Sequence, residues 1–142
     1  ARGQLFAAPA RPGRFVDLTR RSGTRYRFAT FAPDAKTIYA TSDASGEVEI
    51  WALPANGVGE PTQITSGADI LRLSILPSPD GKHIAHSDKN HRLYITNVET
   101  KATTLVAQSE QAIIEDFSWS HDSRWLAYVD RVDNSHGVIQ IY

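Results

Sequence analysis

The sequence contains no cysteine among its 142 residues. Neither its structure nor any activity can therefore depend on a disulfide or a thiolate, and cysteine usage leaves the redox compartment open. Long apolar runs are absent too. No stretch of about 18 apolar residues occurs, so no membrane-spanning helix and no membrane partner are expected. The first residues do not combine a charged stretch with an apolar one, so no signal peptide is expected either.

Sustained helical periodicity is also missing, as are the common motifs of enzymes and nucleotide-binding sites. The sequence has no G-x-S-x-G nucleophile elbow, no phosphate-binding P-loop and no dinucleotide-binding fingerprint. We therefore expect no cofactor and no catalytic residue within this chain.

The composition is typical of a globular protein, with 41% hydrophobic and 22% charged residues. The charge is unevenly distributed, because residues 1–27 carry +6 and the remaining residues carry −7. A basic block can indicate a nucleic-acid-binding arm. Here the arginines are interleaved with the strand-like segment Phe15–Leu18, which favours solvated or channel-facing charges, and no nucleic-acid partner is expected. The seven arginines are Arg2, Arg11, Arg14, Arg20, Arg21, Arg25 and Arg27.

A short motif occurs three times, as Pro33–Lys36, Pro79–Lys82 and His121–Arg124. Its central aspartates, Asp34, Asp80 and Asp122, lie 46 and 42 residues apart. Proline presets a turn and aspartate accepts from the backbone N–H groups that follow it, so each copy predicts a tight turn between strands. A period of 40 to 50 residues built only from short strands is typical of the blades of a β-propeller.

Each period holds four short strand candidates, as a propeller blade requires. The third strand of each blade is expected to carry an aliphatic–aromatic pair, with the two side chains on opposite faces. These pairs are Leu5-Phe6, Ile50-Trp51, Leu93-Tyr94 and Ile141-Tyr142. Innermost strands are expected at 28–31, 73–76 and 116–119, second strands at 37–41, 83–86 and 125–129, and outermost strands at 15–19, 63–65 and 103–106.

The predicted fold is all-β, a propeller fragment of four-stranded antiparallel blades with about three blades present. Residues 1–19 supply the outer two strands of a blade, 20–66 and 67–107 are full blades, and 108–142 supply the first three strands of another. Propellers close with about four to eight blades, which removes exposed strand edges. The chain is therefore expected to be a segment of a larger ring or to self-associate through its exposed blade edges.

Four segments resemble the start of the second, seven-bladed propeller of the tricorn proteases. They are Arg2–Phe6, Thr41–Ile50, Asp88–Tyr94 and Ile114–Tyr128. The sequence departs from the family repeat at three positions: Pro77 stands where an aromatic residue is expected, Ala35 replaces the turn glycine and His121 replaces the turn proline. Similar repeats occur in TolB and in the propellers of prolyl oligopeptidase-type peptidases.

The resemblance implies that the chain is a non-catalytic part of a large cytoplasmic serine peptidase. In that family this propeller admits or filters oligopeptides through its axial channel. The family's catalytic residues lie outside this region, so none is assigned here. Two alternatives remain open: a TolB-like scaffold for protein interactions, and the cap propeller of a prolyl oligopeptidase-type enzyme. As channel-facing candidates that could attract peptide carboxylates we name Arg25, Arg27 and Arg72, which enter the innermost strands.

Three local patterns have simpler explanations than a reactive site. His121, Asp122 and Ser123 are adjacent within the repeated turn, where they cannot form a linear catalytic triad. The histidines His83 and His86 point to opposite strand faces, and His91 adds no third ligand, so no metal site is expected. The segments 88–90 and 130–134 lack the alternating oxygen ligands of a calcium loop and are expected to be hairpin turns.

Overall fold

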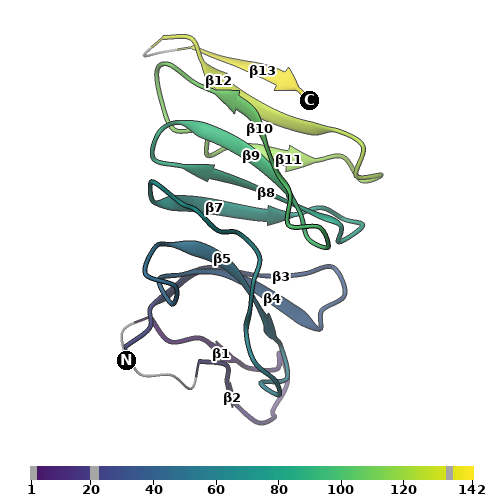
Figure 1. Cartoon of the computed structure of the whole chain (residues 1–142). Coiled ribbons are helices and arrows are strands. Elements are labelled where there is room, and N and C mark those ends of the chain that lie inside the picture. Colours follow the sequence, from purple (N-terminus) through teal and green to yellow (C-terminus); the bar gives the residue numbers. More distant parts are fainter. Residues whose placement is uncertain (1–2, 20–22, 134–135) are drawn as a thin grey trace. The chain divides into compact units, whose positions relative to one another are not determined.

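The computed structural model describes residues 3–19, 23–133 and 136–142. Four of the residues named above, Arg2, Arg20, Arg21 and Asn134, lie outside these ranges. The described residues form strands and loops without a helix, so none could supply a helix long and apolar enough to cross a membrane. The strands of the described residues form four sheets, and within each sheet the strands that follow one another in sequence pair antiparallel. The all-β prediction is confirmed, and Figure 1 labels the strands except β6.

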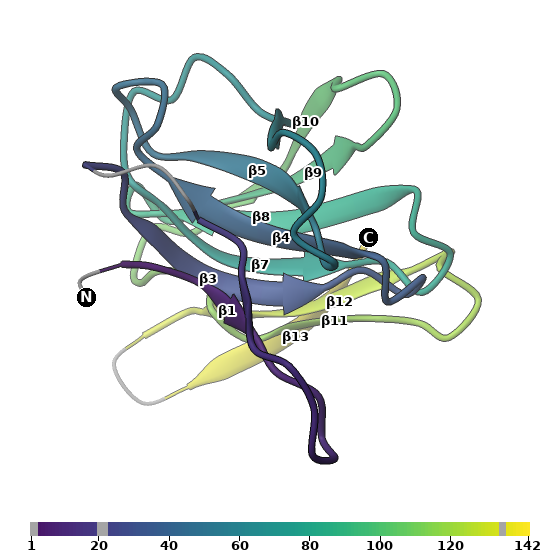
Figure 2. The same ribbon diagram turned by 90° about the horizontal axis from the view of Figure 1, so that it is seen from below.

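Two compact units divide the chain, Ala1–Asp69 and Ile70–Tyr142. The first contains a two-stranded sheet and a four-stranded sheet in the order β3-β4-β5-β6, in which β3, β4 and β5 lie side by side (Figure 2). Its strands are β1 (Phe6–Ala7), β2 (Val16–Asp17), β3 (Tyr26–Phe31), β4 (Thr37–Ser42), β5 (Glu49–Pro54) and β6 (Thr62–Gln63).

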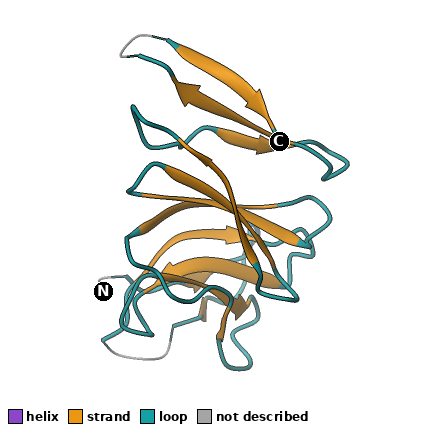
Figure 3. Cartoon of the chain, turned by 45° about the horizontal axis from the view of Figure 1, so that its top comes forward, coloured by secondary structure: helices purple, strands orange, loops and turns teal. Residues whose placement is uncertain are grey.

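The second unit holds a four-stranded sheet, β10-β9-β8-β7, and a three-stranded sheet, β11-β12-β13, drawn as orange strands in Figure 3. Its strands are β7 (Arg72–Pro77), β8 (His83–Asp88), β9 (Arg92–Asn97), β10 (Thr103–Gln108), β11 (Phe117–Trp119), β12 (Leu126–Arg131) and β13 (Gly137–Ile141).

The apolar core of the first unit joins its two sheets. Leu18, which follows β2, packs with Tyr26, Ile38, Ala40 and Leu53 of the larger sheet. The β1–β2 hairpin also repeats the contacts of the β5–β6 hairpin. In the first, the N–H of Leu5 donates to Thr19 Oγ1 at 3.0 Å, and in the second that of Ile50 donates to Thr65 Oγ1 at 2.9 Å. Both hairpins are therefore copies of the same part of the repeat.

Within the second unit, the two sheets pack through a shared apolar cluster. Ala85 and Leu93 from one sheet meet Leu126 from the other and Ile114 from the segment before β11. Two hydrogen bonds fix the contact at its rim. Trp119 Nε1 donates to the carbonyl of Leu76 at 3.1 Å, and the N–H of Asp80 donates to Ser123 Oγ at 2.9 Å. These two sheets are stacked as adjacent blades.

The strand register corrects one prediction. Trp51 pairs with Ala40 and Tyr94 with His86, each six residues after the motif aspartate of its own blade. The equivalent position in the last sheet is Tyr128, and its partner is Gln140. The third-strand pair of this blade is therefore Ile139-Gln140, and the prediction of Ile141-Tyr142 is wrong by two residues. Gln140 stands where the other two sheets have an aromatic residue, and Ile141-Tyr142 repeats the aliphatic–aromatic pattern two residues later.

Candidate functional site

The repeated aspartates organise turns. In the second copy, Asp80 Oδ1 accepts from Ser78 Oγ at 2.6 Å and from the N–H of Lys82 at 3.0 Å. Ser78 Oγ in turn accepts from the N–H of His83 at 3.0 Å. The third copy repeats this pattern: Asp122 Oδ1 accepts from Ser120 Oγ at 2.6 Å and from the N–H of Arg124 at 3.2 Å. The serine hydroxyl in each turn lowers the pKa of its aspartate.

The first copy makes the same turn without the serine, because Ala32 occupies its position. Asp34 Oδ1 accepts instead from the N–H groups of Lys36 at 2.8 Å and Thr37 at 3.0 Å. The bond from Lys36 is the main cause of the lowered pKa of Asp34. All three carboxylates are thus occupied by the local backbone and neighbouring hydroxyls, as the predicted turn requires.

The His121–Ser123 segment does not form a catalytic triad. Asp122 is bound to Ser120 and to the backbone of Arg124, and Ser123 Oγ accepts from the N–H of Asp80 in the preceding blade. Ser123 also has a φ of 60°, which places it in the left-handed region that its turn requires. The segment forms the turn that its place in the repeat predicts.

A row of polar side chains crosses the four-stranded sheet of the second unit. His86 on β8 is fully buried, and its Nε2 lies 2.9 Å from Thr96 Oγ1 on β9, which lies 2.8 Å from Thr103 Oγ1 on β10. The imidazole stacks on Tyr94 with 5.3 Å between ring centroids. Burial, helped by the positive charge of Arg72, lowers the pKa of His86 to about 3. We call these three residues the His86 row.

The three histidines that were weighed as metal ligands, His83, His86 and His91, have separate surroundings. His83 lies against Trp119, with 6.3 Å between the ring centroids, whereas His86 is buried in the row just described. His91 lies in the β8–β9 turn with a φ of 60°. In the part of the chain that the structure describes, no three His, Asp or Glu side chains are arranged to hold a metal ion.

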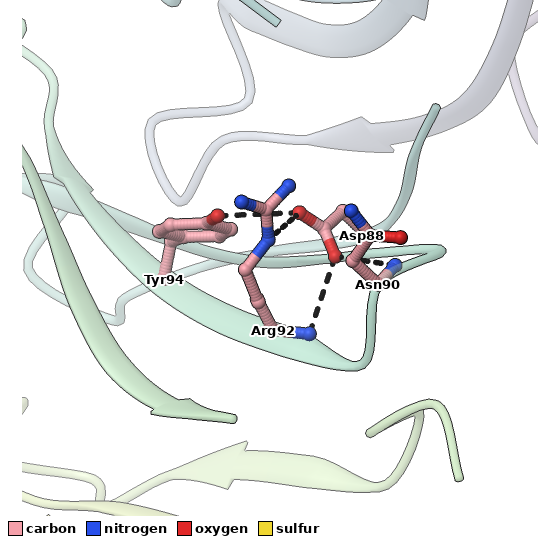
Figure 4. Close-up of polar contacts among 4 residues, drawn as sticks. All are labelled: Asp88, Asn90, Arg92 and Tyr94. Atoms are coloured by element: carbon pink, nitrogen blue, oxygen red, sulfur yellow. Dashed lines mark hydrogen bonds and ion pairs between the residues drawn. The ribbon is translucent and has the colours of Figure 1, made fainter. Parts of the chain in front are cut away.

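A second polar cluster surrounds Asp88 at the end of β8 (Figure 4). The Asp88 side chain is only 2% exposed, and its Oδ2 accepts from Arg92 Nε at 2.7 Å and from the Tyr94 hydroxyl at 3.2 Å. Its Oδ1 accepts from the N–H groups of Asn90 at 2.8 Å and Arg92 at 3.2 Å. Burial first, and then the charge of Asp88, raise the pKa of Tyr94. The carboxylate closes a hairpin turn, so the prediction for this segment is confirmed.

A similar buried carboxylate occurs in the first unit, at the start of β5. Glu49 is 2% exposed, and its two oxygens accept from Thr65 Oγ1 at 2.6 Å and from the N–H of Ala68 at 2.7 Å. Nearby in sequence, Asp43 Oδ1 accepts from the N–H of Arg25 at 2.8 Å. Both acids tie strand ends to the segments that follow or precede them. Neither was predicted, since strand-end acids resemble ordinary surface residues in the sequence.

The three arginines predicted to face a channel differ in exposure. Arg25 and Arg27 are exposed and lie at the start of the first strand of the four-stranded sheet in the first unit. Arg72 begins β7 in the second unit and is only 7% exposed, with its Cα opposite that of Asp88. Arg25 and Arg27 thus present charge to solvent, whereas Arg72 lies among buried polar groups. Their part in attracting peptides stays a prediction.

Comparison with known proteins identifies one family over the whole chain. The family described as "Tricorn protease second beta propeller domain" matches residues 1–142. A Sulfurisphaera tokodaii protein named as a tricorn-like protease subunit is 27% identical over 90% of the chain, and a tricorn protease homolog of Saccharolobus solfataricus is 25% identical over 90%. The chain spans only 14% and 11% of the lengths of these curated relatives.

Solved structures agree on the fold. The crystal structure of the tricorn protease matches 98% of the chain with a TM-score of 0.78 and 16% identity, and the chain covers 13% of that protein. TolB from Acinetobacter baumannii matches 90% of the chain with a TM-score of 0.68 and 24% identity, and here the chain covers 32%. At these identities the likeness shows a propeller fold and leaves function to other arguments.

Proposed function

Because the chain belongs to the family of tricorn protease second β-propeller domains, we propose that it is a non-catalytic segment that filters oligopeptides on their way to a peptidase site elsewhere in its parent. The parent is then a serine peptidase of the cytoplasm. The observation that carries the proposal is that the acidic and hydroxyl groups of the repeat form hydrogen bonds within its turns. Asp34, Asp80 and Asp122 serve the turns of a stacked-blade scaffold rather than a reaction.

Arg25 and Arg27 are the groups best suited to act on a passing peptide. Both are exposed at the start of β3, in the part of the sequence that carries a net charge of +6. Exposed cations that line an entrance raise the local concentration of anionic ligands, and this attraction weakens as salt increases. The arginines would therefore favour peptides by their carboxylates, without binding any one sequence.

The test uses the parent peptidase with Arg25→Glu and Arg27→Glu combined. We expect the kcat/KM for acidic oligopeptides to fall several-fold at low salt, and the difference from the unchanged protein to shrink at high salt. A small chromogenic substrate should be cleaved equally by both. Arg11→Glu, an exposed change of the same charge, is the control. An equal fall in kcat/KM for the acidic oligopeptides and the small chromogenic substrate would contradict the filter. No change in kcat/KM for either substrate would contradict it too.

A scaffold function is the second candidate, supported by the likeness to TolB structures. It differs from the first in that its parent carries no peptidase site. Labelling of the parent by a serine-reactive phosphonate, abolished by prior heat denaturation, supports the peptidase. A folded parent that neither reacts with the probe nor cleaves oligopeptides supports the scaffold.

A further inference from the structure

A pocket of about 480 Å³ lies within the second unit, between the end of the β9–β10 hairpin and the turn that joins β11 to β12. This volume falls in the range of about 300–1,000 Å³ that is common for small-molecule sites. None of the three arginines discussed above lines it. Its lining residues are His83, Ile95, Asn97, Thr100, Ala102, Thr104, Trp119, Ser123, Arg124 and Tyr142.

Three of the lining residues, His83, Trp119 and Tyr142, carry aromatic rings. The Trp119 indole N–H already donates to Leu76, which holds the ring in a single orientation. The His83 ring lies beside it at 6.3 Å and an interplanar angle of 33°. Tyr142 is held at the mouth by paired backbone bonds of 2.9 Å to Leu126. Such rings offer a large apolar surface to a flat or bulky ligand group.

One lining residue brings an uncommitted charge. In residues 3–19, 23–133 and 136–142, the guanidinium of Arg124 makes no hydrogen bond and no ion pair. The nearest acid in sequence, Asp122, directs its Oδ1 to Ser120 Oγ and to the backbone N–H of Arg124. A guanidinium beside aromatic walls is suited to a carboxylate, with which it can form two parallel charge-assisted hydrogen bonds.

We propose that this pocket binds a carboxylate attached to an aromatic group, as in the C-terminal residue of a peptide that ends in phenylalanine or tyrosine. Arg124 binds the carboxylate, and the rings of Trp119 and His83 contact the aromatic side chain. The site is built from residues of the second unit and works by direct contact, whereas Arg25 and Arg27 belong to the first unit, so it is independent of the proposed filter.

The test is titration of the 142-residue chain with N-acetylphenylalanine, followed by NMR through the tryptophan indole N–H signals. N-acetylphenylalaninamide, which has the same ring and no charge, is the matched ligand. We expect the carboxylate to shift the Trp119 signal and to bind at least tenfold more tightly than the amide. The exposed Trp125 provides an internal reference.

Two variants identify the groups responsible. Arg124→Gln should weaken the binding of the carboxylate ligand about tenfold and leave the binding of the amide ligand unchanged. Thr104→Leu, at an exposed position of β10, should fill the pocket and weaken the binding of both ligands. Arg131→Gln, an exposed arginine that does not line the pocket, is the control and should change neither. Equal affinity for acid and amide, absence of binding to the folded chain, or an Arg124→Gln variant that binds normally would overturn the proposal.

Discussion

Single residues in the repeated turns show how the fold tolerates departures from its own pattern. The residue after each motif aspartate has a positive φ: 54° at Ala35, 73° at Gly81 and 60° at Ser123. Only glycine adopts this conformation without a steric cost from Cβ. Ser123 has a compensating contact, since its Oγ accepts from the N–H of Asp80. Ala35 has no side-chain group that could compensate.

Replacing Ala35 by glycine should therefore stabilise the chain by about 0.5–1 kcal/mol, because it relieves the left-handed alanine. The opposite change, Gly81→Ala, places a Cβ at the equivalent position and should destabilise by a similar amount. Urea unfolding of the two variants measures both changes. A loss of stability in Ala35→Gly would mean that the entropy of the unfolded chain outweighs the strain.

The buried imidazole of His86 makes stability depend on pH. Burial lowers its pKa from the usual 6.5 to about 3, so the unfolded chain takes up a proton before the folded chain does. The stabilisation that comes from keeping His86 neutral in the folded chain is complete above about pH 6.5. It is lost as the pH falls towards 3. Between pH 7 and pH 5 we expect a loss of up to about 2 kcal/mol.

Urea unfolding at pH 7 and pH 5 tests this dependence. His86→Gln should be less stable than the unchanged chain at pH 7 but should lose little more at pH 5. The exposed His136→Gln is the control and should keep the full pH dependence. If the free energy of unfolding of His86→Gln falls between pH 7 and pH 5 as much as that of the unchanged chain, another group is responsible for the pH dependence.

At the scale of strands and hairpins, the Asp88 cluster holds the β8–β9 turn closed. Four donors converge on one carboxylate: the N–H of Asn90, the N–H and Nε of Arg92, and the Tyr94 hydroxyl. Removing a buried acceptor leaves its donors unsatisfied, and this costs more than the net value of the bonds themselves.

Asp88→Ala should thus lower the free energy of unfolding by about 2–4 kcal/mol. Glu115→Ala, a change at an exposed acid, should alter it by no more than about 0.5 kcal/mol. Hydrogen exchange should show faster opening of the β8–β9 hairpin in the first variant alone. If both variants unfold at the same urea concentration, the cluster contributes little.

The sequence predicts the strands and turns well because their signals are local. Asp34, Asp80 and Asp122 each determine a turn within four residues, and the strand periodicity follows from alternation. Two features depend on distant residues and were missed. The third-strand pair in the last blade was misplaced because the strand register puts Gln140, rather than an aromatic residue, opposite Tyr128. Arg72 is buried because its Cα lies opposite that of Asp88, sixteen residues later, which only the register reveals.

At the scale of the whole molecule, the last sheet carries large apolar side chains that are exposed in the described structure. On β13, Ile139 is 71% and Ile141 68% exposed, and Trp125 beside β12 is 52% exposed. Apolar surface of this kind, next to an edge strand, favours association with another copy.

We expect the average mass measured by light scattering to rise with protein concentration. The double variant Ile139→Lys and Ile141→Lys should remain closer to a monomer, because it places charge on the exposed strand. Val58→Lys, at an exposed position in the first unit, is the control. A monomer at every concentration for the unchanged chain would exclude self-association.

The His86 row links the interior of its sheet to water. His86 Nδ1 has no hydrogen-bond partner among the described residues, so the neutral ring is better accommodated with its proton on Nε2, where Thr96 can accept it. The Thr96 hydroxyl then donates to Thr103, which is exposed at the outer strand. The two bonds thus have one polarity, from the buried ring outward. A proton on the imidazole can reach solvent through the hydroxyl groups of Thr96 and Thr103 while the ring itself stays buried. It can therefore exchange with water without opening of the sheet.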